Sequence, residues 1–222
     1  MGPGVLGSPD SYGGYRQRLV ETLQDKGIRS LPVLRAIATV PRHLFVPDSA
    51  QHRAYEDSAL PIAAGQTISQ PYVQARSIEE LELTGQEKVL EVGAGSGYQT
   101  ALLSVLAGNV VAVERVPQLA EGARRILAQL GYRNATVVLG DGTLGWRSLA
   151  PFDAIVVAAA SPAIPDPLIE QLAPGGRMVI PLGNREEQTL VKVRKVGDRI
   201  DSSVLTDVRF VPLLGEFGFK SA

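Results

Sequence analysis

Short apolar runs alternate with helical segments along the middle of the chain, and this rhythm limits the possible folds more than any other feature. Near-continuous apolar strands suit a parallel sheet that is covered on both faces. The predicted strands lie at residues 88–92, 109–114, 135–141, 152–160 and 177–183. The predicted helices between them lie at residues 96–107, 117–131 and 164–176. This order predicts an α/β fold with a doubly wound, mostly parallel sheet.

The regions on either side of this rhythm follow different patterns. Residues 188–196 and 200–213, joined by a turn, are predicted to form a C-terminal antiparallel hairpin, which brings the sheet to seven strands. Upstream, helices are predicted over residues 15–27 and 31–40, the first ending at a glycine and the second followed by a proline. These two helices form an N-terminal helical extension of the sheet.

Composition argues against several classes of function. A chain of 222 residues is long enough for one α/β domain with a substantial core. Lysine and arginine total 22 against 23 aspartates and glutamates, so there is no basic surplus for nucleic acid. The absence of cysteine and the presence of two histidines argue against thiolate chemistry and a metal site. No long apolar run or leader pattern is present, so we expect a cytoplasmic protein with no membrane partner.

A glycine-rich turn follows the first predicted strand. In "VLEVGAGSGYQT", Gly93, Gly95 and Gly97 stand between an apolar run and the start of a helix. Ligands of doubly wound sheets bind beyond the carboxyl ends of the strands, where the next helix presents unpaired N–H groups. A tight strand-to-helix turn also favours glycine, so the turn alone is a weak sign of a nucleotide-type site.

Two acidic residues follow the next two strands. Glu114 ends the second strand about twenty residues after the glycine turn, where a carboxylate can bind both ribose hydroxyls. Asp141 ends the third strand and, with Gly142, can contact an adenine edge. Their ordinary interpretations are a solvated strand-end charge and an Asp–Gly turn. Together with the glycines they indicate an adenosine-bearing cofactor, either a dinucleotide or S-adenosylmethionine.

Longer motifs resemble one family. The segments "VLEVGAGSGYQTALL", "VERV", "GDG", "PFDAIVV" and "LAPGGRMVIPLG" resemble the ordered motifs of class I S-adenosylmethionine-dependent methyltransferases with a Rossmann-like fold. The segments "VPRHLFVP", "ALPIAAGQTISQPYVQARSIEELEL" and "VRFVPL" are similar to those of the protein-L-isoaspartate O-methyltransferases within that class. The resemblance covers Tyr15 to Leu214, and "GQTISQP" is its most specific part. Ala63 departs from it, because many members have glycine there.

The resemblance implies a reaction and a set of site residues. The reaction is transfer of a methyl group from S-adenosylmethionine to the α-carboxyl of L-isoaspartyl residues in damaged proteins and peptides, which starts their repair. Ser69 is the implied catalytic residue, and Thr67, Ser69 and Leu214 are the implied substrate-binding residues. The implied cofactor-binding residues are Gln66, Thr67, Ile68, Ser69, Glu91, Gly93, Gly95, Glu114, Asp141 and Gly142. Among them Glu91 would receive the ammonium group, unless it is a strand-end charge satisfied by backbone N–H groups.

The chain is expected to divide into a tail and one domain. Residues 1–14, which are rich in glycine, proline and serine and have no apolar period, are predicted to be a flexible tail, and residues 15–222 a single methyltransferase domain. Within that domain we expect a helical, substrate-side region at 15–86, a cofactor-binding core at 87–183 and the C-terminal hairpin at 184–222. We expect a monomer, because no apolar surface stripe demands a partner.

Other functions remain open from the sequence alone. A carboxyl group is already ionised at neutral pH, so the scarcity of histidine does not argue against this acceptor. Ser69 is also a good N-cap for the helix predicted to start within "QPYVQ". The alternatives are a non-catalytic adenosine-cofactor-binding module, a methyltransferase of another carboxylate, and a nicotinamide-dependent oxidoreductase. The last of these would leave "GDG" and "PGG" unexplained.

Overall fold

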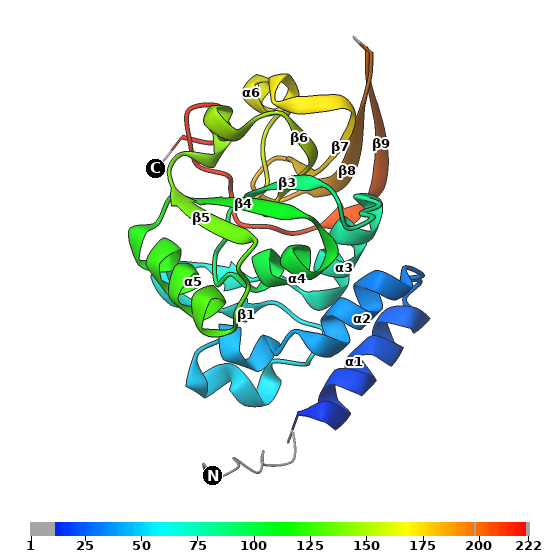
Figure 1. Ribbon diagram of the computed structural model, residues 1–222, viewed down its shortest axis with the longest axis vertical. Coiled ribbons are helices and arrows are strands. Elements are labelled where there is room, and N and C mark those ends of the chain that lie inside the picture. Colours follow the sequence, from blue (N-terminus) through cyan, green and yellow to red (C-terminus); the bar gives the residue numbers. More distant parts are fainter. Residues whose placement is uncertain (1–11, 198, 221–222) are drawn as a thin grey trace, which may run out of the picture.

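A seven-stranded sheet forms the centre of the computed structural model, which describes residues 12–197 and 199–220 (Figure 1). Its strand order is β5-β4-β3-β6-β7-β8-β9, in which the first five strands are parallel, and β8 and β9 each pair antiparallel with the strand before them. The strands are β3 (Lys88–Val92), β4 (Asn109–Glu114), β5 (Ala135–Leu139), β6 (Phe152–Val157), β7 (Leu172–Gly183), β8 (Gln188–Val196) and β9 (Arg199–Val208). The predicted doubly wound, mostly parallel seven-stranded sheet with a C-terminal hairpin is confirmed.

The helices and a small second sheet surround this centre. The α-helices are α1 (Gly13–Asp25), α2 (Leu31–Thr39), α3 (Pro71–Glu80), α4 (Tyr98–Leu106), α5 (Pro117–Gln129) and α6 (Asp166–Glu170). A two-stranded antiparallel sheet pairs β1 (Leu60–Pro61) with β2 (Thr67–Ile68) just before α3. The short 3₁₀ helices are η1 (Arg42–Phe45), η2 (Asp48–Arg53), η3 (Ala63–Gly65), η4 (Gly142–Leu144) and η5 (Arg147–Leu149). No helix within the described ranges is long and apolar enough to cross a membrane.

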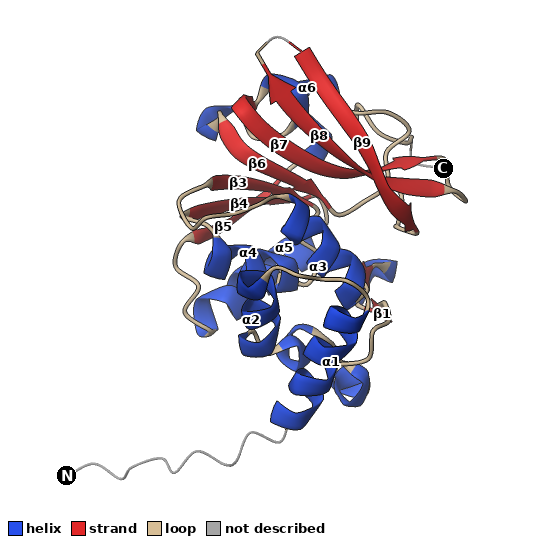
Figure 2. Ribbon diagram, turned by 90° about the vertical axis from the view of Figure 1, so that its right-hand side faces the viewer, coloured by secondary structure: helices blue, strands red, loops and turns tan. Residues whose placement is uncertain are grey.

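Both faces of the sheet are buried, which explains the near-continuous apolar strands. Successive residues of a strand point to opposite faces, and Val89 and Leu90 of β3 accordingly belong to two different core clusters. The larger cluster joins the sheet to α1 through α5, whereas Leu168 of α6 packs in the smaller one. Figure 2 shows this unequal covering, with most helices on one side of the sheet and α6 on the other.

The strand order reverses direction between β3 and β6. From β3 the chain builds outward through β4 to β5, and it then returns to place β6 on the other side of β3. The loops after β3 and β6 therefore diverge and open a crevice at the carboxyl ends of these strands. Ligands of open α/β sheets bind at such a reversal.

Several expectations about element bounds need correction. The strands expected over 135–141 and 152–160 end at Leu139 and Val157, the strand expected from residue 177 begins at Leu172, and the helix expected from residue 96 begins at Tyr98. The helix expected over 164–176 ends at Glu170, because Leu172 already pairs with Phe152 and the following proline and glycines oppose helix. The strand expected to end at residue 213 ends at Val208. The first helix begins at Gly13, before the expected start at residue 15, while residues 1–11 of the predicted tail lie outside the described residues.

Candidate active site

A cavity of about 450 Å³ lies in the crevice at the carboxyl ends of β3, β4 and β6. Its volume is in the range of small-ligand sites. All but one of the implied catalytic, cofactor-binding and substrate-binding residues line it: Gln66, Thr67, Ile68, Ser69, Glu91, Gly93, Gly95, Glu114, Gly142 and Leu214. Asp141 does not. The fold thus brings together residues that are far apart in the chain, from Gln66 to Leu214.

The glycine turn owes its composition to its backbone. Gly93, Gly95 and Gly97 have φ angles of 92°, 54° and 86°, all in the left-handed region that side chains rarely adopt. At Gly97 a Cβ atom would also lie 3.2 Å from the Cβ of Ala123 on α5. The turn therefore needs glycine whether or not a ligand binds, and the glycines alone carry no functional argument.

Glu114 ties the glycine turn to the end of β4. Its carboxylate is buried and accepts hydrogen bonds from the amides of Gly95 and Val116, each at 2.9 Å. It is therefore not a solvated strand-end charge. Each carboxylate oxygen has a second acceptor site, so the group can still receive the two hydroxyls of a ribose in the cavity.

Glu91 is a fully buried acid on the cavity wall. Burial raises its pKa to about 8, and hydrogen bonds from Thr100 and Gln99 offset the shift only in part. The Thr100 hydroxyl lies 2.5 Å and the Gln99 amide nitrogen 3.2 Å from the carboxyl oxygens. These partners are side chains of α4, so the alternative of a charge satisfied by backbone N–H groups is wrong. At neutral pH the group is mostly protonated and ready to ionise beside a cation.

Ser69 does not cap the helix that follows it, contrary to one expectation. The N-cap position of α3 is Gln70, which makes no side-chain cap. Instead the Asp57 carboxylate, from a distant loop, accepts the Tyr72 amide at 2.8 Å and thereby caps the helix. The Ser69 hydroxyl makes no hydrogen bond within the described part of the chain. It therefore stands free where the cavity meets an adjoining groove of about 740 Å³, which Thr67 and Ser69 also line.

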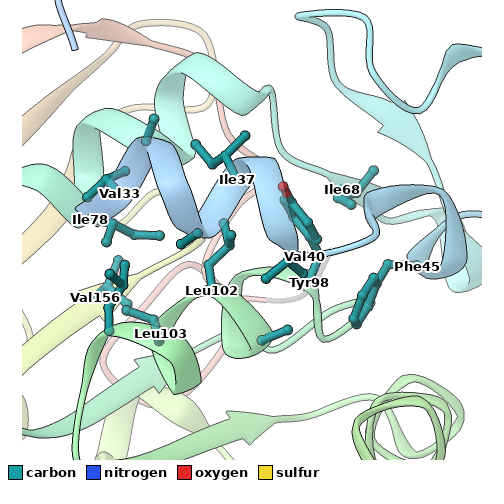
Figure 3. Packing of buried hydrophobic residues seen from close by; sticks show 14 of the residues in the cluster. Val33, Ile37, Val40, Phe45, Ile68, Ile78, Tyr98, Leu102, Leu103 and Val156 are labelled. Atoms are coloured by element: carbon teal, nitrogen blue, oxygen red, sulfur yellow. The ribbon is translucent and has the colours of Figure 1, made fainter. Parts of the chain in front are cut away.

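The segment that carries Ser69 is fixed by its neighbours. Ile68 is 3% exposed and packs in the larger core cluster, where Figure 3 places it near Val40, Phe45 and Tyr98. Its backbone pairs with Leu60 in the small second sheet. The Ile68 side chain is thus anchored in the core, while Thr67 and Ser69 line the cavity and the groove.

Asp141 binds the C-terminal segment. One of its oxygens accepts the Thr143 amide and hydroxyl, and the other accepts the Glu216 amide at 2.8 Å. Burial alone would raise the pKa of Asp141, but these hydrogen bonds outweigh it and hold the pKa below its usual value. The neighbouring Gly142 lines the cavity, and a Cβ atom there would lie 2.5 Å from Val92. Close packing is therefore sufficient reason for this glycine.

The C-terminal segment crosses the cavity as a further wall. After β9, Ala160 exchanges backbone hydrogen bonds with Val211 and Leu213 at 2.8 and 2.7 Å. This contact carries Leu214 to the cavity. Among the lining residues that the sequence analysis did not single out are Gln74, Gln99, Arg115, Val116, Ala158, Ala159 and Val211. Arg115 and Ala158 follow strand ends directly, a signal that could have identified them, whereas Gln74 and Gln99 lie inside helices.

Comparisons with known proteins agree on one family. A family model described as protein-L-isoaspartate(D-aspartate) O-methyltransferase (PCMT) matches residues 15–218. A protein-L-isoaspartate O-methyltransferase of Dictyoglomus thermophilum is 54% identical over 209 residues, covering 94% of this chain and 95% of the relative. A protein of the same name from Methanoculleus marisnigri is 52% identical over 206 residues, covering 92% of this chain and 94% of the relative.

Solved structures give the same result. One named protein-L-isoaspartate O-methyltransferase superposes with a TM-score of 0.82 at 29% identity, covering 91% of this chain and 67% of the other. A beta-aspartate methyltransferase (PCMT) of Plasmodium falciparum, solved in complex with S-adenosyl-L-homocysteine, gives a TM-score of 0.79 at 26% identity and covers 90% of this chain and 98% of its own. The resemblance drawn from the sequence motifs is thereby confirmed.

Proposed function

The chain belongs to the protein-L-isoaspartate(D-aspartate) O-methyltransferase family, and from this premise we propose that the cavity and its adjoining groove carry the reaction of that family. The protein is an enzyme that transfers a methyl group from S-adenosylmethionine to the α-carboxyl of L-isoaspartyl residues in damaged proteins or peptides. The roles of individual residues in this reaction are our proposal.

The donor end of the site is built by the sheet. When bound, S-adenosylmethionine supplies an electrophilic methyl group on a positively charged sulfur. The chain fits such a group, because Glu114 and Glu91 are buried acidic side chains that line the same cavity. We assign Glu91, Gly93 and Gly95 to the methionine part, Glu114 to the ribose and Gly142 to the adenine, with Gln66 to Ser69 as the wall toward the acceptor.

The acceptor end is built by the segment before α3. A carboxyl group with a pKa of about 4 is ionised at neutral pH, so no residue needs to remove a proton from the nucleophile. The task of the protein is to align the carboxylate with the methyl group and to exclude water. We assign this task to the Ser69 hydroxyl, with Thr67 and Leu214 lining the acceptor side.

One observation carries this assignment above the others. The Ser69 hydroxyl has no hydrogen-bond partner in the described chain, and it stands where the cavity opens into the groove. The groove runs between the start of α3 and residues 207–211, so a peptide lying in it can present a carboxylate to Ser69.

Transfer of labelled methyl to matched peptides tests the function. Two peptides of the same composition, one with an L-isoaspartyl and one with an L-aspartyl linkage, are incubated with the protein and labelled S-adenosylmethionine. Only the isoaspartyl peptide should accept label. Label on both would indicate a methyltransferase of another carboxylate, and binding of S-adenosylhomocysteine without transfer would indicate a non-catalytic binding module.

The proposal also covers the cellular location, the oligomeric state and the protein substrates. A cytoplasmic location and a monomeric state are predictions from the sequence, and the protein substrates are those in which asparagine or aspartate has rearranged. Size-exclusion chromatography with light scattering at micromolar concentration should give a mass close to the 23.6 kDa of one chain.

A further inference from the structure

A fully buried arginine lies directly beneath the acceptor segment. Arg42 of η1 is 0% exposed, and its guanidinium donates three hydrogen bonds. Nη2 donates to the Ser69 carbonyl at 2.8 Å, Nη1 to Gln74 Oε1 at 2.9 Å, and Nε to the Ala54 carbonyl at 2.8 Å. One side chain therefore connects η1, the loop after η2, the acceptor segment and α3.

Among the residues that the structure describes, the positive charge of Arg42 has no ionised partner in contact with it. Its three hydrogen-bond acceptors are uncharged, and the fourth neighbour is the Tyr98 ring, whose centre lies 4.8 Å from the guanidinium carbon. Asp57 acts on it only through space, and that carboxylate is already paired with Lys26 at 2.5 Å. Burial lowers the pKa of Arg42 to about 10, so the group remains protonated at neutral pH.

An uncompensated buried charge is costly, so its position calls for a reason. Fields act over longer distances in a protein interior than in water. The Arg42 field therefore reaches the cavity wall formed by Ser69 and Gln74, where an anion would gain from it. Glu114, which we assign to the ribose, lines the same cavity as Ser69 and Gln74. The site thus combines acidic side chains with the field of a buried cation.

We propose that Arg42 is a positioning residue for the methyl transfer, which holds the Ser69 backbone and supplies the positive charge that draws the acceptor carboxylate to it. This inference rests on the proposed function, because it takes the acceptor to be an anion docked at Ser69. It predicts that the enzyme prefers a carboxylate over a neutral carboxamide of the same shape, and that this preference depends on Arg42.

Two substitutions of Gln74 separate the electrostatic effect of Arg42 from the structural effect of its hydrogen bond to Gln74. Gln74→Glu keeps the hydrogen bond to Arg42 Nη1 and adds a carboxylate beside it, which cancels the field. Gln74→Met is the matched control, because it removes the hydrogen bond and leaves the charge of Arg42 uncompensated. The probes are an L-isoaspartyl peptide and its α-carboxamide analogue, compared as competitors for binding at low ionic strength.

The preference for the carboxylate should fall about tenfold in Gln74→Glu and stay within about threefold of wild type in Gln74→Met, as expected for a charge effect at a partly screened site. Equal preference in wild type and Gln74→Glu would overturn the inference. A purely structural role for Arg42 would instead change the melting temperature of both variants and leave the preference unchanged.

A second pair of variants covers misfolding of Gln74→Glu. Arg42→Lys keeps the charge and loses the planar fork, so it should keep the carboxylate preference with a lowered kcat. Arg42→Met should lose the preference, and the same preference in both folded variants would contradict the inference. A wild-type protein that fails to methylate isoaspartyl peptides would overturn the proposed function itself. An active wild type with unaltered preferences in all variants would overturn only the role of Arg42.

Discussion

At the scale of single residues, the site depends on side chains whose burial changes their chemistry. Glu91 is an acid kept mostly neutral by its surroundings, and Arg42 is a buried cation whose hydrogen-bond acceptors in the described chain are all uncharged. Ser69 is the opposite case, a polar group left free because another residue performs the structural task expected of it. Each of these properties gives a measurable consequence.

Binding of S-adenosylhomocysteine should depend on pH through Glu91. The pKa of about 8 in the free protein means that the group carries a proton at pH 7. An ammonium beside it favours the carboxylate, so binding lowers the pKa and releases the proton. Affinity should therefore rise as pH increases from 6 to 8, by up to about tenfold per unit.

Calorimetry in two buffers with different ionisation enthalpies measures the released proton directly. Glu91→Gln is the control, because it keeps the shape of the side chain and cannot ionise. The variant should bind without proton release and with a flat pH profile. Proton release that persists in Glu91→Gln would assign the ionisation to another group.

Ser69→Ala should lower kcat/KM without loosening the fold. A hydrogen bond to a charged group contributes about 1.5–3 kcal/mol, so the loss should be roughly tenfold to a hundredfold. The melting temperature should hardly change, because Ser69 is not the cap of α3. Normal methyl transfer by Ser69→Ala would refute its role.

Asp57→Ala is the structural counterpart. Because Asp57 caps α3 through the Tyr72 amide, its loss should destabilise the protein by about 1 kcal/mol. Chemical denaturation and methyl-transfer assays on both variants should therefore give opposite patterns. Ser69→Ala should have lower activity and unchanged stability, whereas Asp57→Ala should have lower stability.

At the scale of elements, sequence patterns predicted the centre of the sheet better than its connections. Strands such as Lys88–Val92 follow from local apolar runs, because burial on both faces demands them. The cap on α3 could not be predicted, since Asp57 is brought to the Tyr72 amide only by folding. Likewise β9 ends at Val208, because the backbone that follows forms hydrogen bonds with Ala160, which is distant in sequence.

The same reasoning explains what was missed at the site. The strand-end residues Glu91 and Glu114 were found because parallel strands bring their carboxyl ends to one edge. Arg42 was missed because nothing local in "VPRHLFVP" indicates that its guanidinium reaches Ser69, 27 positions away. The contact of the Asp141 carboxylate with the Glu216 amide was missed for the same reason, since it joins residues 75 positions apart in the chain.

The C-terminal segment should loosen when Asp141 is removed. In Asp141→Ala the Glu216 amide loses its acceptor, so its hydrogen exchange should accelerate. Binding of S-adenosylhomocysteine should weaken several-fold, because Leu214 belongs to the cavity wall that this contact fixes. The exposed Asp25 on α1 provides a matched control, and Asp25→Ala should change neither quantity. Unchanged exchange at Glu216 would mean that Asp141 does not restrain the segment.

At the scale of the whole molecule, two regions meet at the cavity. The sheet edge contributes Glu91 and Glu114, and the region before the sheet contributes Thr67, Ser69 and, from below, Arg42. The strand reversal beside β3 opens the crevice, and the C-terminal segment adds its remaining wall. A ligand that fills the cavity would therefore contact segments from many parts of the chain, which makes global stability a sensitive measure of binding.

Saturating S-adenosylhomocysteine should stabilise the whole protein. A ligand at a hundred times its Kd adds about 2.7 kcal/mol to the free energy of unfolding. NAD at the same concentration should leave the melting temperature unchanged, because the family uses a sulfonium donor. Stabilisation by NAD alone would point to the oxidoreductase alternative, and thermal melts with each ligand decide between the two.

The separation of Ser69 from the glycine turn has a consequence for how such enzymes can diversify. The groups assigned to the donor come from a sheet edge whose geometry is fixed by strand pairing, whereas those assigned to the acceptor come from an excursion of the chain ahead of it. A related enzyme could therefore carry a different segment ahead of the sheet and accept a different nucleophile, while its binding site for the methyl donor stays the same.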